Sequence, residues 1–502
     1  MSNLVGHVFV LMLENRSFDH MLGFSAIQGR DAETGVSTHI NGLAGSEANT
    51  FNGHTFPVIH SAVSTMPIDP GHEFSSVLGQ LCGPGATYQA GGVYPPINNS
   101  GFVASYAASG GGSDPAEVMK CFAPEQLPVL VALAQEFALC DNWHASMPGS
   151  TWPNRMFVHA ASSGGLDHSP TTEEIVEWET IGGFQFRAGN IFDALKAKGV
   201  ARRLYAGDDF PMVAALKGIS LLDIRHYSNF AADLGKPTYP YSYVFIEPSY
   251  HVLNEYRGST SQHPLTDITL GEGLIKETYE AIRNSPRWNS SVLIITWDEH
   301  GGFYDHAIPP GAVSPGDTAA GDKNDKNNEN GFTFQQYGPR VPAIVISPLV
   351  PRNTIDHRLY DHASIPATLE ALFGVNALTQ RDAKANHLDV LLSLDTPRSD
   401  CPTTLPSPPT APAGRQVMKM AVPALGESVA ARPDATVNEG TLPVVIQSAM
   451  HQDLEMSPGQ RNEILQRVRS IRTREQARQY LAQVQTKVRS YRAVRSGGLN
   501  LE

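Results

Sequence analysis

Carboxylate and amide side chains follow two apolar runs that lie far apart in the sequence. The run VFVLML leads into Glu14 and Asn15, and the run VLIITW leads into Asp298 and Glu299. Both runs are typical of buried strands, and a buried carboxylate without a partner costs a large free energy. Hard divalent cations take oxygen ligands from several chain segments. We therefore predict a metal site at the point where the two strands end.

A pair of hydroxyl side chains lies between these two runs, in the segment PGSTWPNR. Ser150 and Thr151 come just before Pro153, a residue that suits the first turn of a helix. The N-terminus of a helix offers unpaired N–H groups and positive potential, which suit a phosphoryl group. A hydroxyl bound to a metal ion there becomes an alkoxide nucleophile. On spacing alone, however, a simple N-cap is the favoured interpretation of Thr151.

Apolar strands alternate with helical segments through the first 375 residues. Strands are expected within 1–13, 241–248, 290–297 and 340–350, and helices within 124–137, 153–163, 190–199, 269–285 and 364–374. This alternation predicts an α/β fold with parallel strands, covered by helices on both faces. Ligands of such sheets bind outside the carboxyl ends of the strands. The two polar pairs should therefore meet at one edge of the sheet.

The charge of the chain is distributed unevenly. The 502 residues carry a formal net charge of −13, with 24 Lys and Arg against 42 Asp and Glu in residues 1–400. An acidic body argues against nucleic acid as a partner, because phosphate backbones need basic surfaces. None of the four cysteines belongs to a CxxC pair, so we expect buried free thiols, with a disulfide as the alternative. These cysteines are Cys82, Cys121, Cys140 and Cys401.

The sequence carries no pattern typical of membrane insertion or of a cleaved signal. No apolar run approaches the roughly 20 residues that span a bilayer. The first residues lack a basic region, and Glu14 interrupts the first apolar run before any cleavage site. We therefore expect a protein that stays in the cytoplasm or is exported by a route that needs no cleaved signal.

The C-terminal hundred residues differ from the rest of the chain. Residues 401–456 are expected to form a Pro-rich linker and an irregular segment. Residues 457–495 have apolar positions at helical spacing and are expected to form one helix or two, with ten basic and two acidic residues between 461 and 495. Such a basic amphipathic tail can lie on an anionic membrane, but packing on the acidic body or on a partner is the favoured alternative. The polar segment 314–331 is expected to be a solvated insertion.

Several of these segments resemble the phosphoesterase family that contains non-specific phospholipases C and an acid phosphatase, within the alkaline-phosphatase superfamily. The motifs ENRSFDHMLG, DPGH, PGSTWPNR, SQHP and DEHGGFYDH occur here in the order of that family. The resemblance covers roughly residues 5–375. It implies an alkaline-phosphatase-like domain over 1–400, with the C-terminal helices as an extension that the resemblance does not cover.

The resemblance also implies a set of metal ligands. Glu14, Asn15, Asp298 and Glu299 match positions that bind the metal ion, and Thr151 matches the nucleophile, which is an additional ligand. Ser150 is adjacent, but the match to PGSTWPNR favours Thr151. Ligation by oxygen alone favours Ca²⁺, with Mg²⁺, Mn²⁺ and Zn²⁺ as alternatives.

The matched motifs place basic side chains around the same centre. By the resemblance, His72 and His263 contact phosphate or move protons, and His300 belongs with them as a catalytic residue. Arg155 and His306 match positions where they would bind substrate, although Arg155 could equally brace its loop.

The activity implied by the resemblance is that of a phospholipase C. Such an enzyme hydrolyses glycerophospholipids at a membrane to diacylglycerol and a phosphorylated head group, here through a phosphothreonine. An acid phosphatase is the alternative, because a phosphomonoesterase can share the whole metal site. A third interpretation is a toxin or scaffold whose tail, residues 401–502, binds a partner. Ser17 and Asp19 are expected to hold the first loop.

Overall fold

The structure is a computed structural model that describes residues 4–179, 182–317, 326–409 and 432–497. Its main sheet contains β1 (His7–Leu13), β2 (Gln28–Asp31), β3 (Ser37–His39), β6 (Ala138–Cys140), β8 (Arg202–Ala206), β9 (Ile224–His226), β10 (Tyr243–Glu247), β11 (Ser291–Trp297), β12 (Ala343–Ile346) and β13 (Thr354–Asp356). Two small sheets pair β4 (Ala48–Phe51) with β5 (His54–Pro57) and β7 (Trp143–His144) with β14 (Tyr360–Asp361).

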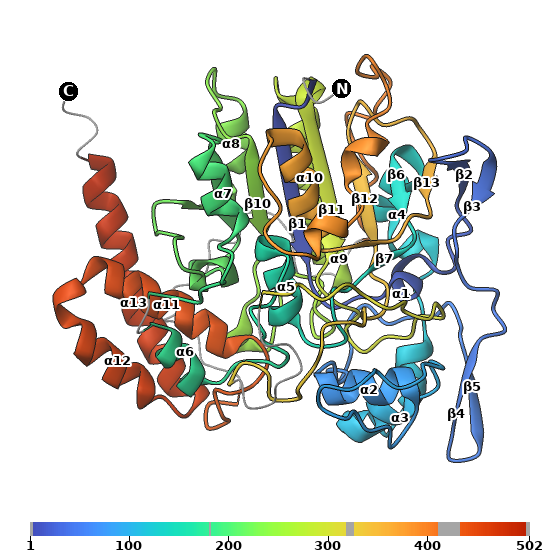
Figure 1. The fold of residues 1–502 in the computed structure, drawn as a ribbon, viewed down its shortest axis with the longest axis horizontal. Coiled ribbons are helices and arrows are strands. Elements are labelled where there is room, and N and C mark those ends of the chain that lie inside the picture. The colour runs from blue at the N-terminus through green and yellow to red at the C-terminus, as the bar shows by residue number, and fades with distance from the viewer. Residues whose placement is uncertain (1–3, 180–181, 318–325, 410–431, 498–502) are drawn as a thin grey trace.

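Thirteen α-helices are described in these ranges. They are α1 (Phe18–Leu22), α2 (Phe74–Cys82), α3 (Phe102–Tyr106), α4 (Pro128–Glu136), α5 (Thr151–Ala160), α6 (Thr172–Glu179), α7 (Ile191–Ala197), α8 (Phe230–Leu234), α9 (Ile268–Arg283), α10 (Ser364–Phe373), α11 (Leu442–Met456), α12 (Arg461–Arg469) and α13 (Arg474–Gly497). Helices α5, α7 and α10 lie in front of the sheet in Figure 1, and α4 and α9 lie behind it.

The ten strands are ordered β3-β2-β13-β6-β12-β11-β1-β10-β8-β9. Strand β1 lies between β10 and β11 and is parallel to both. All seven residues of β1 and all seven of β11 are buried, because helices cover both faces of the sheet. The predicted α/β fold with a mostly parallel sheet is confirmed.

One expected strand runs against its neighbours. Strand β12, within the predicted 340–350 run, is antiparallel to both β11 and β6. An apolar run gives no information on strand direction. The chain leaves β11 at the carboxyl edge and enters β12 from that same edge, so β12 has to run back.

The sequence predicted an irregular segment up to residue 456, and this prediction is wrong for residues 442–456. Residues 442–456 form helix α11, in which Pro443 occupies the first turn and twelve of the fifteen residues are buried. A helix surrounded by protein is apolar on most sides and lacks the stripe that marks an amphipathic helix. The first residues of the predicted linker, 401–409, are described: Cys401 and Leu405 are buried, and Tyr279 of α9 donates to the carbonyl of Pro402 at 2.6 Å. Residues 410–431 lie outside the described ranges, as do residues 318–325 of the predicted polar insertion.

The tail consists of two helices, α12 and α13, that pack on the body beside α11 and α6 (Figure 1). The apolar positions Leu481, Val484 and Val488 of α13 are buried. They belong to the same hydrophobic core as the strands of the main sheet. The tail therefore packs on the body, which is the alternative favoured over a free amphipathic helix.

Two further expectations concern cysteines and membrane spans. All four cysteines are free thiols, and three of them are buried. Within the described ranges, no helix combines the length and the apolar character needed to cross a bilayer.

The packing of α13 predicts a contrast between two valines of that helix. Val488 is fully buried and Val494 is 77% exposed. Val488→Ala should lower the free energy of unfolding by about 2 kcal/mol, because two buried methyl groups are removed. Val494→Ala should change it by less than about 0.5 kcal/mol. Urea unfolding followed by circular dichroism measures both, and equal effects would contradict the packing described.

Candidate active site

The ends of β1 and β11 bring the predicted carboxylates to one edge of the sheet. The strands are parallel, with Leu13 opposite Trp297, so Glu14 and Asp298 leave the sheet next to each other. The backbone N–H of Asn15 donates to Asp298 Oδ1 at 2.9 Å. The two polar segments therefore meet, as their position after buried strands predicted.

Helix α5 directs its N-terminus at this edge. Ser150 is the N-cap, and Thr151 is the first helical residue, so the N-cap interpretation of Thr151 is wrong by one position. The Thr151 hydroxyl donates to Asn15 Oδ1 at 3.4 Å. The first-turn N–H groups of a helix have no partner within it, so the edge offers donors for an anion beside this hydroxyl.

Several buried polar atoms at this edge lack a hydrogen-bond partner among the described residues. They are both carboxylate oxygens of Glu14, Nδ2 of Asn15, Oγ of Ser150 and Oε1 of Glu299. Burial raises the pKa of Glu14 well above its usual value, and Arg155 and Ser261 offset only part of this effect. An ionised carboxylate that is buried without hydrogen-bond donors costs a large free energy unless a cation pairs with it. A divalent ion that prefers oxygen ligands fits these residues.

Asp298 is held from three sides. It accepts hydrogen bonds from the backbone N–H groups of Asn15 and Glu299, and Arg155 Nε lies 2.9 Å from its Oδ2. Arg155 also donates to the carbonyl of Leu13 at 3.0 Å. Burial raises the pKa of Asp298 to about 6, although Arg155 lowers it. Arg155 thus braces the strand ends, and its predicted contact with substrate stays a prediction.

The tightest groups of acidic, histidine and cysteine side chains lie elsewhere. Three such groups in the described part of the chain have their ligand atoms within 4.8 Å of one another, and none of them contains Glu14, Asp298 or Glu299. Two members of the predicted ligand set, Asn15 and Thr151, would bind through an amide and a hydroxyl oxygen. They therefore fall outside groups made of acidic, histidine and cysteine side chains.

Two predicted histidines share an aspartate. His263 Nε2 lies 3.5 Å from Asp69 Oδ2, and the rings of His72 and His263 are 6.4 Å apart. Burial works against a charge on His72, but Glu299 and Asp69 raise its pKa to about 9. Burial, with help from His72 and Arg16, lowers the pKa of His263 well below its usual value. With no cation on Glu299, His72 is therefore charged at neutral pH, and His263 is neutral.

The third predicted histidine lies behind a predicted ligand. His300 Nδ1 is 3.3 Å from Glu299 Oε2, and His300 Nε2 is 2.7 Å from Gln80 Oε1. The ring is fully buried. His300 thus lies against the Glu299 carboxylate, but its Nδ1 makes no hydrogen bond within the described residues, and its predicted catalytic role stays a prediction.

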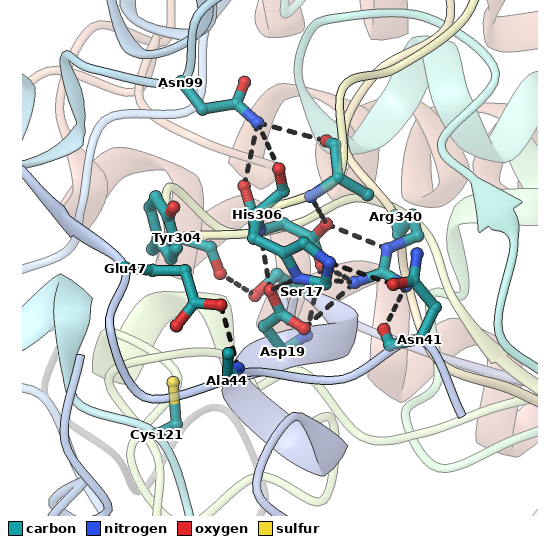
Figure 2. Close-up of polar contacts among 12 residues, drawn as sticks. Ser17, Asp19, Asn41, Ala44, Glu47, Asn99, Cys121, Tyr304, His306 and Arg340 are labelled. Atoms are coloured by element: carbon teal, nitrogen blue, oxygen red, sulfur yellow. Dashed lines mark hydrogen bonds and ion pairs between the residues drawn. The ribbon is translucent and has the colours of Figure 1, made fainter. Parts of the chain in front are cut away.

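His306 belongs to a different cluster (Figure 2). Its Nδ1 lies 2.7 Å from Asp19 Oδ2, and its Nε2 lies 3.1 Å from Asn41 Oδ1. Arg340 pairs with both Asp19 and Asp305 at 2.9 Å. Ser17 donates to the carbonyl of Tyr304 at 2.7 Å, and with Asp19 it holds the first loop, as expected. The structure thus places His306 in a bracing network, and its predicted contact with substrate stays a prediction.

Four residues near the site were missed by the sequence analysis. Glu247 is the last residue of the apolar strand β10, and Glu14 directly follows β1, so the same sequence signal marks both. Glu247 accepts from the N–H groups of residues 212 and 213. Asp69 stands inside the DPGH motif. His362 lies 2.6 Å from the Asp298 carbonyl through its Nε2. Tyr256 stacks on a predicted histidine, and no pattern in the sequence marks it.

Comparisons with known proteins agree with this arrangement. The Phosphoesterase family model matches residues 5–376. Non-specific phospholipase C6 of Arabidopsis thaliana is 37% identical over 80% of this chain and 74% of its own length. Phospholipase C A of Mycobacterium tuberculosis is 26% identical over 80% of both chains.

A solved structure of a protein in the alkaline phosphatase superfamily from Vibrio parahaemolyticus matches with a TM-score of 0.31 and 16% identity. It covers 53% of this chain and 66% of that one. The family match extends over the strand ends, helix α5 and the histidines alike. The chain belongs to the Phosphoesterase family and is a hydrolase that acts on phosphoester bonds.

Proposed function

We propose that this chain is a phospholipase C that hydrolyses glycerophospholipids to diacylglycerol and a phosphorylated head group. The observation that carries the proposal is the Thr151 hydroxyl at the start of α5, facing buried and unpaired strand-end oxygens. The names of the relatives, which are phospholipases C, support this substrate class.

We propose that Glu14, Asn15, Asp298, Glu299 and Thr151 hold a divalent metal ion, with Ca²⁺ favoured. When bound, such an ion lowers the pKa of a ligated hydroxyl and stabilises negative charge on phosphoryl oxygens. The unpaired oxygens of Glu14 and Glu299 support this ligand set.

In the first step, Thr151 releases its proton to solvent and its Oγ1 forms a bond to phosphorus. The bond from phosphorus to the glycerol oxygen breaks, and charged His72 donates a proton to that leaving oxygen. The N–H groups at the start of α5 donate to the phosphoryl oxygens, where negative charge develops. The products of this step are diacylglycerol and a phosphothreonine.

In the second step, water attacks the phosphothreonine and releases the head-group phosphate. His72, left neutral by the first step, can take a proton of the attacking water. The Nδ1 of His263 accepts from the N–H of Leu265, so its Nε2 carries the hydrogen and orients Asp69 beside His72. Thr151 takes a proton from solvent as the bond from its oxygen to phosphorus breaks, and the water proton restores the charge of His72 for the next cycle.

We propose that the C-terminal helices touch the membrane through charge and not through their apolar face. The apolar face of α13 is buried in the body. Arg467 and Arg469 of α12 are exposed. In Figure 1, β1 starts at the upper edge of the molecule and runs downward, so its carboxyl end and α12 both lie in the lower half. Anionic lipid would attract such arginines.

Replacing the proposed nucleophile should abolish turnover. Thr151→Ala should lower kcat by at least about 10³-fold, because the attacking oxygen is lost. Ser150→Ala is the matched control, since it removes the neighbouring hydroxyl and should keep most activity. Assays with a soluble phosphodiester, together with thermal unfolding of both variants, measure this. Near-normal turnover by a folded Thr151→Ala variant would move the nucleophile elsewhere.

Product analysis distinguishes a phospholipase C from a phosphatase. With phosphatidylcholine in mixed micelles, we expect diacylglycerol and phosphocholine, and a chelator should stop both. The chelator should also lower the Tm, because an ion that binds only the folded state stabilises it. Intact lipid together with release of inorganic phosphate from a monoester would favour the acid phosphatase instead.

Membrane attraction predicts a charge effect at α12. The double variant Arg467→Gln and Arg469→Gln should weaken binding to phosphatidylserine vesicles by about 5-fold per arginine, since each contributes about 1 kcal/mol. Lys196→Gln with Lys198→Gln makes the same change of charge at the exposed end of α7. Vesicle co-sedimentation at low salt measures both, and equal effects would contradict the proposed face.

A further inference from the structure

The side chain of Tyr256 lies flat against the imidazole of His263. The two ring centroids are 3.5 Å apart and the ring planes differ by 5°. Both side chains are buried, with 9% exposure for Tyr256 and 2% for His263. A ring stacked this closely cannot rotate without moving its neighbour. The plane of the imidazole is therefore set by where Tyr256 stands.

The phenol of Tyr256 is fixed in turn by the C-terminal region. Its hydroxyl lies 2.9 Å from Thr441 Oγ1 and accepts from the Thr441 N–H at 3.3 Å. Thr441 is the N-cap of α11. A Cβ atom on Gly440 would lie 2.8 Å from the phenol oxygen, and the φ of Gly440 is +54°. Both facts favour glycine at position 440, so the backbone before α11 packs directly against the Tyr256 hydroxyl.

The backbone that carries Tyr256 is strained. His251, Glu255 and Tyr256 all have a left-handed φ, of 48°, 49° and 60°. Residues other than glycine rarely adopt this conformation, and it persists only where the surroundings impose it. The loop from 251 to 256 therefore depends on contacts outside itself.

Contacts from the C-terminal region meet this loop at two further points. Arg432 forms an ion pair with Glu255. Arg474 donates to the carbonyl of Val252. With the bond from Thr441 to Tyr256, three separate parts of residues 432–474 hold the loop in place.

We infer that Tyr256 is a positioning residue for His263, and that its bond to Thr441 makes the C-terminal helices part of the active site. This inference rests on the proposed function, in which His263 orients Asp69 beside His72. The stack presents the Nε2 of His263 to Asp69, while the N–H of Leu265 occupies Nδ1. A change at Thr441, in a region that the family match does not include, should therefore alter chemistry at the strand ends.

The test compares two tyrosine–threonine pairs. Tyr256→Phe removes both bonds to Thr441, and Thr441→Val removes the bond to Oγ1 but leaves the bond from the backbone N–H. Both variants keep the stack, so Tyr256→Phe should lower kcat about 5-fold and Thr441→Val by a smaller factor, with KM unchanged. Tyr256→Asn removes the ring at a backbone position that asparagine tolerates, and it should lower kcat by about 10- to 100-fold. The hydroxyl groups of Tyr227 and of Thr278 on α9 form an equivalent hydrogen bond of 2.7 Å. Tyr227→Phe and Thr278→Val are therefore the controls and should leave kcat unchanged.

A second measurement needs no turnover. In protein labelled with ¹³C at histidine Cε1, the His263 signal, assigned with His263→Gln, should lie upfield because of the tyrosine ring current. The shift should remain in Tyr256→Phe and disappear in Tyr256→Asn. An unchanged shift in Tyr256→Asn would overturn the inference. So would equal kcat values for the Thr441→Val and Thr278→Val variants. A wild-type protein with the ring shift but no hydrolysis of phospholipid would count against the proposed function alone.

Discussion

Uncompensated negative charge at the ends of β1 and β11 is the constraint on which the site depends. Both strands are buried on both faces, so Glu14 and Asp298 have no access to bulk water. Arg155 is the cation that the chain itself supplies, and it pairs with Asp298. Arg155 stands one helical turn after Thr151 in α5, on the same side of that helix. The ion pair that anchors the helix therefore also turns the hydroxyl towards the strand ends.

A second buried acidic cluster shows what a compensated arrangement looks like. Asp19 and Asp305 share Arg340, and every oxygen of the two carboxylates has a polar partner. Glu14 and Glu299 are equally buried, yet three of their four oxygens lack a hydrogen-bond partner among the described residues. The same chain thus satisfies one cluster with its own arginine and leaves the other open to a cation. This contrast, and not the number of acids, supports the proposed ligand site.

The sequence predicts those parts of the site that depend on local pattern. Apolar runs located the strands, and polar residues directly after them located the edge, because parallel strands end together. The direction of β12 could not be predicted, since it depends on where the chain re-enters the sheet. Helix α11 was missed because burial on most sides leaves no polar stripe. Tyr256 was missed because its partners, His263 and Thr441, meet it only through the tertiary fold.

The composition of the C-terminal region does not reveal what this region packs on. Its excess of positive charge suggested a negatively charged partner. The body of the same chain supplies some of that negative charge, because Arg432 pairs with Glu255 and Arg489 pairs with Asp209. Such exposed ion pairs contribute little free energy, so they select an orientation more than they provide adhesion. The adhesion comes from apolar side chains that join the main core. A segment attached in this way can hold a strained loop at the active site, which a flexible tail could not do.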